Sequence, residues 1–209
     1  MDEIRALLRD GCDALGLVLS GETMGAVVAY VQLLQRWNRR INLVGTRDLG
    51  GLVAQHVVDA LAVTLCLPDG PGRLIDVGSG AGLPGALIAI ARPDVAVTAL
   101  EPIHKKQAFI ATVQRELSLG NLRALAQRME EHAGFVPYDM AVSRATFALP
   151  EWLSRARGLV REGGTILAME GREQHVLPSG AVRRRYVLGD RRRAIVVWRV
   201  GGDVLGRDG

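Results

Sequence analysis

A glycine-rich stretch, residues 74–85, contains the residues best suited to holding a ligand, and it reads Leu-Ile-Asp-Val-Gly-Ser-Gly-Ala-Gly-Leu-Pro-Gly. The pattern predicts a strand that turns tightly and enters a helix, with Pro84 in the first helical turn. Glycines there allow positive φ and let a ligand approach the backbone closely, and the helix start would offer free N–H groups to an anion. Because open α/β sheets bind ligands at the carboxyl ends of their strands, we expect a ligand against Gly78 and Gly80.

Two ligands compete for this loop. The run 80–85 satisfies GxGxxG, which is typical of dinucleotide sites. That match would place its first glycine well past the strand end, and it leaves the carboxylate of Asp76 unexplained. A carboxylate at the mouth of the pocket is unfavourable beside a pyrophosphate and favourable beside a ligand that carries an ammonium and a sulfonium. Asp76 therefore favours S-adenosylmethionine as the cofactor.

Glu101 ends the next predicted strand, twenty-five residues after Asp76. A carboxylate in this place can accept hydrogen bonds from both ribose hydroxyls of a nucleoside. Enzymes that bind NAD use the same device, so Glu101 predicts a ribose without distinguishing the two cofactors.

The elements that must position these residues alternate between strands and helices after a breaker cluster at 68–72. Strands are expected at 73–77, 95–100, 122–126, 139–142 and 165–169. Helices are expected at 84–91, 104–117 and 150–159. This order indicates an α/β fold with a parallel sheet covered on both faces, and 182–188 with 193–200 predicts an antiparallel hairpin at its edge. Helical periodicity at 2–17, 23–38 and 51–67 predicts a helical N-terminal cap over 1–67, followed by one compact domain over 73–200 and a flexible tail over 201–209.

Length and composition limit the class of protein. The 209 residues suit one domain with a substantial core, and 48% hydrophobic against 23% charged residues is typical of a globular chain. No apolar run approaches the ~20 residues that cross a bilayer, and the start lacks a secretory signal, so a cytoplasmic protein is expected. Cys12, Cys66 and four scattered histidines give no metal-ligand spacing, so no metal is expected.

Positive charge is concentrated near the C-terminus. Residues 170–200 contain eight arginines and three acidic residues, although the net charge of the chain is only +4. A smaller basic cluster lies at 36–47. Such clusters suit a polyanion, but a chain with 24 arginines and 2 lysines could also owe them to composition alone. We expect RNA contacts from six arginines: Arg39, Arg40, Arg47, Arg183, Arg184 and Arg185.

Taken with Asp76 and Glu101, six further motifs make the chain resemble the RsmG (GidB) family of class I methyltransferases. These motifs are 42–48 (Asn-Leu-Val-Gly-Thr-Arg-Asp), 56–59 (His-Val-Val-Asp), 82–85 (Gly-Leu-Pro-Gly), 105–109 (Lys-Lys-Gln-Ala-Phe), 128–130 (Arg-Met-Glu) and 142–145 (Val-Ser-Arg-Ala). The resemblance runs from about residue 37 to residue 200. It implies a seven-stranded, mostly parallel Rossmann-like sheet, and methylation of N7 of a guanine in the 530 loop of 16S rRNA. The partner would be this rRNA or the small ribosomal subunit, with the enzyme acting as a monomer.

The resemblance also implies roles for individual residues. Gly78 and Leu83 would contact the cofactor, Met129 and Glu130 would flank its adenine, and Arg144 would lie beside its methionine end. Three positions depart from the family pattern: Gln55 replaces an arginine, Ala60 a serine and Glu170 a lysine.

Guanine N7 carries a lone pair and no proton, so its methylation needs no general base, and we expect no catalytic acid or base. Two other functions stay open on the sequence alone. The chain could methylate a small molecule or a protein, or it could be an RNA-binding assembly factor that holds no cofactor.

Overall fold

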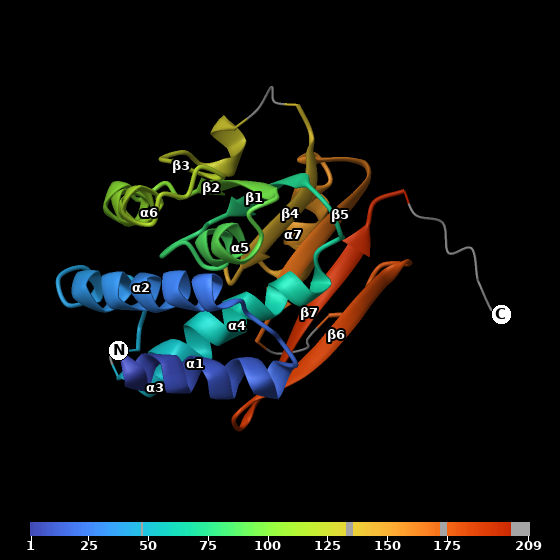
Figure 1. Cartoon of the computed structure of the whole chain (residues 1–209). Coiled ribbons are helices and arrows are strands. Elements are labelled where there is room, and N and C mark those ends of the chain that lie inside the picture. The colour runs from blue at the N-terminus through green and yellow to red at the C-terminus, as the bar shows by residue number, and fades with distance from the viewer. Residues whose placement is uncertain (47, 133–135, 172–174, 202–209) are drawn as a thin grey trace.

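A seven-stranded sheet forms the centre of this computed structural model, which describes residues 1–46, 48–132, 136–171 and 175–201. The strand order is β3-β2-β1-β4-β5-β7-β6 (Figure 1). The bounds are β1 Gly72–Val77, β2 Val95–Leu100, β3 Leu122–Leu125, β4 Tyr138–Arg144, β5 Val160–Glu170, β6 Ala181–Leu188 and β7 Arg191–Arg199. Strands β1 to β5 pair in parallel, and β7 runs antiparallel to both β5 and β6. The predicted α/β fold with an antiparallel C-terminal hairpin is confirmed.

Helices cover both faces of the sheet because successive strand residues alternate between two hydrophobic clusters. Leu74 belongs to the cluster shared with α5 (Gly85–Ala91) and α6 (His104–Glu116), whereas its neighbour Ile75 packs with α7 (Leu149–Ala156) on the other face. Trp152 of α7 anchors this second face, where it is 1% exposed and donates its indole N–H to the carbonyl of Leu167 at 2.9 Å.

The N-terminal helices pack on the α5 face and share its core. Helix α1 (Asp2–Leu15) and helix α2 (Gly21–Asn38) run alongside each other on this side of the sheet (Figure 1). Ser20 caps α2 by accepting a hydrogen bond from the N–H of Thr23. One continuous core joins the helices of residues 1–67 to the sheet of residues 73–200. The division of the chain into a cap and a domain therefore stays a prediction.

A third helical stretch runs from Leu49 to Cys66 and changes its winding along the way. It consists of α3 (Leu49–Leu52), a π-helical turn (Val53–Val58), α4 (Asp59–Leu61) and a 3₁₀ turn (Ala62–Cys66). Its length and mean hydropathy of 1.6 are those of a membrane span, so the expectation that no such run exists was wrong. Half of the stretch is buried inside the molecule, however, and it contains the buried carboxylate of Asp59, as suits a core helix.

Most predicted elements match to within a few residues, and the largest difference is in β5. This strand was expected at 165–169, but it begins at Val160. Gly163 and Gly164 interrupt the hydrophobic pattern of the strand, so its first residues could not be predicted from that pattern. Glycine is needed at 164, because a Cβ there would lie 2.8 Å from the carbonyl oxygen of Arg161. The predicted tail at 201–209 lies outside the described residues except for Gly201.

Candidate active site

A cleft of about 680 Å³ opens at the carboxyl ends of β1, β2, β4 and β5. Its floor is the glycine loop that follows β1, including Gly78 and Gly80, with Leu83 behind it. Glu101 follows β2, and Arg144 ends β4. Five of the eight residues predicted to bind the cofactor, Gly78, Gly80, Leu83, Glu101 and Arg144, therefore line one cavity.

Positive φ angles bend the glycine loop back over the sheet. Gly78 has φ 74° and Gly80 has φ 59°. A Cβ on Gly78 would lie 2.2 Å from the hydroxyl oxygen of Thr146, which belongs to the loop after β4 and also lines the cleft. The close approach of these two loops requires glycine at this position.

Asp76 lies beneath this loop and does not line the mouth of the cleft, contrary to the sequence expectation. Its side chain is completely buried, and its Oδ2 accepts hydrogen bonds from the hydroxyl of Ser79 at 2.5 Å and the N–H of Gly85 at 2.8 Å. The N–H of Ala86 bonds to the carbonyl of Gly82. The start of α5 therefore does not present these N–H groups to an external anion, because Asp76 already provides the negative charge there. A pyrophosphate would meet this carboxylate, which argues against a dinucleotide.

Burial also affects the ionisation of Asp76. Desolvation raises the pKa of the carboxyl to about 6, although the hydrogen bonds from Ser79 and Gly85 and the charge of Arg144 act to lower it. Its Oδ1 is buried and has no hydrogen-bond partner among the described residues. An unpaired carboxylate oxygen of this kind makes the region under the loop favourable to positive charge.

Glu101 is held in the cleft by the backbone. Its side chain is 4% exposed, Oε2 accepts from the N–H of Gly80 at 2.8 Å, and Oε1 accepts from the N–H of Ile103 at 2.9 Å. Each carboxylate oxygen has a further lone pair available to a donor. Glu101 thus fixes the glycine loop and still offers two acceptor positions to a ligand.

A polar cluster forms the opposite wall of the cleft, around the buried carboxylate of Asp59. Tyr186 donates to Asp59 Oδ1 at 2.8 Å, and Arg144 and Arg193 each lie 3.5 Å from a carboxylate oxygen. The cluster joins the helical stretch, β4 and the β6–β7 hairpin. His56 lies one turn before Asp59, in the π-helical segment, where such irregular turns often mark functional sites. Burial and then the charge of Arg144 lower the pKa of His56 to about 4.

Comparison with known proteins identifies the family. A protein-family model described as "GidB: rRNA small subunit methyltransferase G" matches residues 24–179. The chain belongs to this family. A protein from Alkalilimnicola ehrlichii named ribosomal RNA small subunit methyltransferase G is 42% identical over 172 residues, which cover 82% of this chain and 77% of that protein. A protein of the same name from Burkholderia pseudomallei is 39% identical over 196 residues, covering 89% and 84%.

Solved structures bear out the fold at the level of architecture. A SAM-dependent methyltransferase from Aquifex aeolicus superposes with a TM-score of 0.51 and 15% identity, covering 70% of this chain and 92% of that one. This member of the rRNA small subunit methyltransferase G family therefore has the Rossmann-like fold of the class I methyltransferases.

Two residues expected near the adenine of the cofactor lie outside the cleft lining. Met129 and Glu130 form a 3₁₀ turn after β3, the strand next to β2. Met129 packs against the α7-side core, and Glu130 pairs with Arg155 at 2.6 Å. They lie at the same edge of the sheet as Glu101, whose N–H bonds to the carbonyl of Leu125 at the end of β3.

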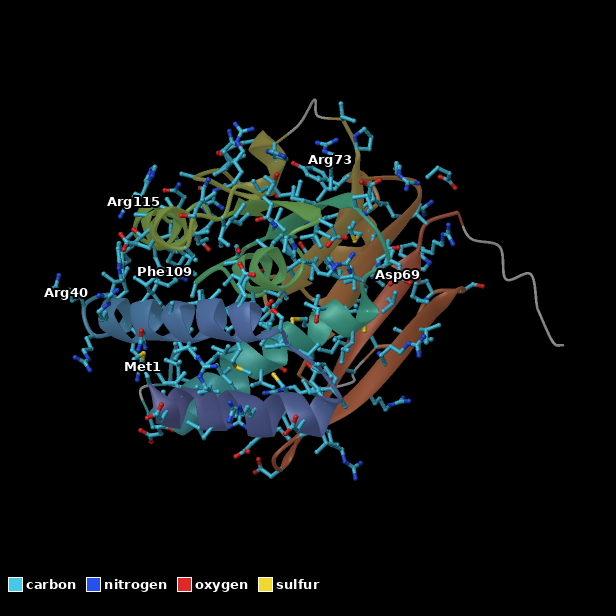
Figure 2. The ribbon with its side chains drawn as sticks, in the orientation of Figure 1. Met1, Arg40, Asp69, Arg73, Phe109 and Arg115 are labelled. Carbon is cyan, nitrogen blue, oxygen red and sulfur yellow. The ribbon has the colours of Figure 1, made fainter. Side chains whose placement is uncertain are left out.

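The arginines predicted to contact RNA occupy two places. Arg39 and Arg40 are exposed at the end of α2 and line a separate groove that also includes Trp37. Figure 2 shows Arg40 at the outer edge of the molecule. The Trp37 ring packs edge-on against Phe109, with 5.5 Å between ring centroids, so it belongs in part to the core. Arg47 lies outside the described residues.

The second group of arginines lies on β6, where the three side chains differ. Arg184 and Arg185 are exposed, but Arg183 is largely buried and forms a two-pronged pair with Glu170, at 2.7 and 3.3 Å. Glu170, which stands where the family pattern has a lysine, is therefore paired with an arginine of the same chain.

Sequence reasoning missed several cleft residues. Thr146 and Tyr186 gave no signal, because their importance depends on which loops and strands meet in the fold. Asp59 and His56 were part of the quoted motifs, but spacing gave them no role. Among the described residues there is no group of three His, Cys, Asp or Glu side chains that could hold a metal ion.

Proposed function

We propose that this protein transfers the methyl group of S-adenosylmethionine to N7 of a guanine in the 530 loop of 16S rRNA. Family membership supports methylation of small subunit rRNA. The observation that supports the cofactor assignment is the joint geometry of Glu101 and Asp76. The Glu101 carboxylate lies in the cleft with lone pairs that a ribose could use, while the Asp76 carboxylate occupies the helix start that a pyrophosphate would need.

The residues of the cleft fit this cofactor. The two oxygens of Glu101 retain acceptor capacity for two ribose hydroxyls, and Gly78 and Gly80 present no side chain to the cleft. The Asp76 carboxylate beneath the loop and the Glu101 carboxylate in the cleft both make this region favourable to a ligand that carries positive charge. We propose that Met129 and Glu130 approach the adenine from the neighbouring strand, and that Arg144 lies near the carboxylate of the methionine end.

The cofactor, when bound, supplies an electrophilic methyl group on sulfur, and the chain's own residues must bring the base to it. Guanine N7 has no proton to lose, so the chain needs to orient the ring in line with the methyl group and exclude water. His56, with its pKa near 4, is a weak proton acceptor, in agreement with a reaction that uses no general base.

The charge that develops on guanine during transfer also needs a partner. In the cleft wall, Asp59 is already paired with Arg144 and Arg193. A phosphate of the RNA is therefore the group that we propose to balance the charge of the product. We further propose that the protein acts as a monomer in the cytoplasm, on this rRNA alone or within the small subunit.

The direct test is transfer of labelled methyl from S-adenosylmethionine to 16S rRNA purified from a strain that lacks the modification. We expect one label per rRNA in the 530 loop, and cleavage chemistry specific for N7-methylguanine should place it on a guanine. Small subunits from the same strain are tested in parallel. Label at another atom, or on a small molecule or protein in place of RNA, would refute the assignment. Absence of transfer and of cofactor binding would favour a non-catalytic assembly factor.

A further inference from the structure

The last residue of helix α2, Asn38, holds the loop that follows this helix. Its Oδ1 accepts hydrogen bonds from the N–H groups of Leu43 at 2.8 Å and Val44 at 3.0 Å. Its Nδ2 donates to the carbonyls of Val44 at 3.1 Å and Thr46 at 3.2 Å. One carboxamide therefore binds four backbone groups of the loop 43–46, which is neither helix nor strand.

This loop forms part of the active-site cleft. Leu43 and Val44 line the same cavity as Gly78, Gly80 and Glu101. Each of the two side chains is 7% exposed and packs in the core that α2 and α5 share, so the rest of the molecule supports them from behind. They add apolar surface to a cleft that also contains charged side chains, and a ligand pocket needs both kinds of surface.

The far end of the loop contacts the helical stretch that begins at Leu49. Thr46 Oγ1 lies 3.1 Å from Nε2 of His56, which also lines the cleft. Thr46 packs closely on α3 as well, where a Cβ on Gly51 would lie 2.6 Å from its Cγ2. The loop is thus held by Asn38 on one side and abuts α3 on the other.

We propose that Asn38 is a positioning residue for cofactor binding: it holds the loop 43–46 in the conformation in which Leu43 and Val44 contact S-adenosylmethionine. Asn38 acts through this loop, because Leu43 and Val44, and not Asn38, are among the described residues of the cleft lining. This role rests on the proposed function, since it takes S-adenosylmethionine as the ligand. When a loop adopts its binding conformation only part of the time, the apparent Kd rises by the inverse of that fraction.

Calorimetric titration of the full chain with S-adenosylmethionine tests this role. N38A removes all four hydrogen bonds, and we expect the Kd to rise about tenfold, which corresponds to a loop in place in about one tenth of the free protein. N38D has the same size and keeps the acceptor, but a carboxylate cannot donate to the carbonyls of Val44 and Thr46. We expect a similar rise for N38D. Single-turnover methyl transfer at saturating cofactor should stay near the wild-type rate, because the bound cofactor restores the loop.

A second pair of variants acts on the loop from its other side. In G51A the new Cβ would collide with Thr46 and would lie 2.8 Å from Oδ2 of Asp48, so we expect a higher Kd. G50A is the matched control. It adds the same methyl group to the same helix, where the Cβ would lie at an ordinary distance of 3.7 Å from Oδ1 of Asp48, and we expect a wild-type Kd.

Hydrogen exchange of the ligand-free protein follows the loop itself. We expect the amides of Leu43 and Val44 to exchange faster in N38A than in the wild type, because both donate to Asn38. The amides of α5 should exchange at the same rate in both proteins if the global fold is unchanged. A higher Kd without faster exchange in the loop would overturn the positioning role.

The same measurements separate this role from the proposed reaction. A wild-type Kd in a folded N38A or N38D variant, or an equal change in G51A and G50A, would overturn the positioning role even if methyl reaches guanine N7. A higher Kd in N38A, N38D and G51A, but not in G50A, would support it even if the methyl group goes to another acceptor. In that case only the proposed reaction would be wrong.

Discussion

Replacement of Glu101 by alanine tests the most specific role assigned in the cleft. The proposed complex loses two ribose hydrogen bonds to a charged acceptor, each worth about 1.5–3 kcal/mol. Even at the lower limit, the sum is about 3 kcal/mol, or roughly a 100-fold rise in the Kd for S-adenosylmethionine. The substitution also removes the acceptor for the N–H groups of Gly80 and Ile103. Each unpaired group costs about 1 kcal/mol or more of folding stability.

Calorimetric titration with S-adenosylmethionine and urea unfolding, run on the same preparations, separate the two effects. Glu101→Gln keeps one acceptor oxygen and should lose less affinity than Glu101→Ala. The control is Asp69→Ala in the exposed turn before β1, at the end of the sheet away from the cleft, which should leave the Kd unchanged. A Glu101→Ala variant that is folded and binds the cofactor with wild-type affinity would refute the ribose role.

Three other substitutions examine the loop and the opposite wall. Gly78→Ala should abolish cofactor binding while the fold persists, because its Cβ would collide with Thr146, and wild-type affinity by calorimetry would contradict that steric reasoning. Burial raises the pKa of the Asp76 carboxyl to about 6, so the folded protein holds this proton more tightly than the unfolded chain. The contribution of Asp76 to the free energy of unfolding should therefore fall by about 3 kcal/mol as the pH rises from about 4 to above 6. Asp76→Asn should remove this fall in urea titrations, and an identical pH profile in both proteins would disprove it. Asp59→Asn should lower methyl transfer more than cofactor affinity, since it releases Arg144 and Tyr186 from their shared partner; an unchanged single-turnover rate would exclude this positioning role.

The sequence predicted the sheet and the glycine loop well because both depend on local patterns. Alternation of short apolar runs with helical periodicity reveals a parallel sheet, and glycines after a strand reveal the turn. The position of Glu101 was also predicted from local pattern. A residue that ends the second strand must lie at the carboxyl edge of the sheet, whatever its distant contacts are.

Features that depend on distant contacts were not predicted. The position of Asp76 beneath the loop follows from how the following residues fold back, with Ser79 and Gly85 turned toward the carboxylate. The cluster around Asp59 needs three elements to meet, and the pair between Glu170 and Arg183 depends on strand register. Charge counting drew attention to the C-terminal hairpin, but it could not tell which of its arginines share a face.

We infer that the cleft binds a cationic methyl donor whose ribose lies against Glu101. Crystals soaked separately with S-adenosylmethionine and with NAD⁺ examine it directly. We predict density for S-adenosylmethionine, with both ribose hydroxyls within hydrogen-bond distance of the Glu101 carboxylate, and none for NAD⁺. A cleft that stays empty with the methyl donor, or that accepts a pyrophosphate against the loop after β1, would refute this inference.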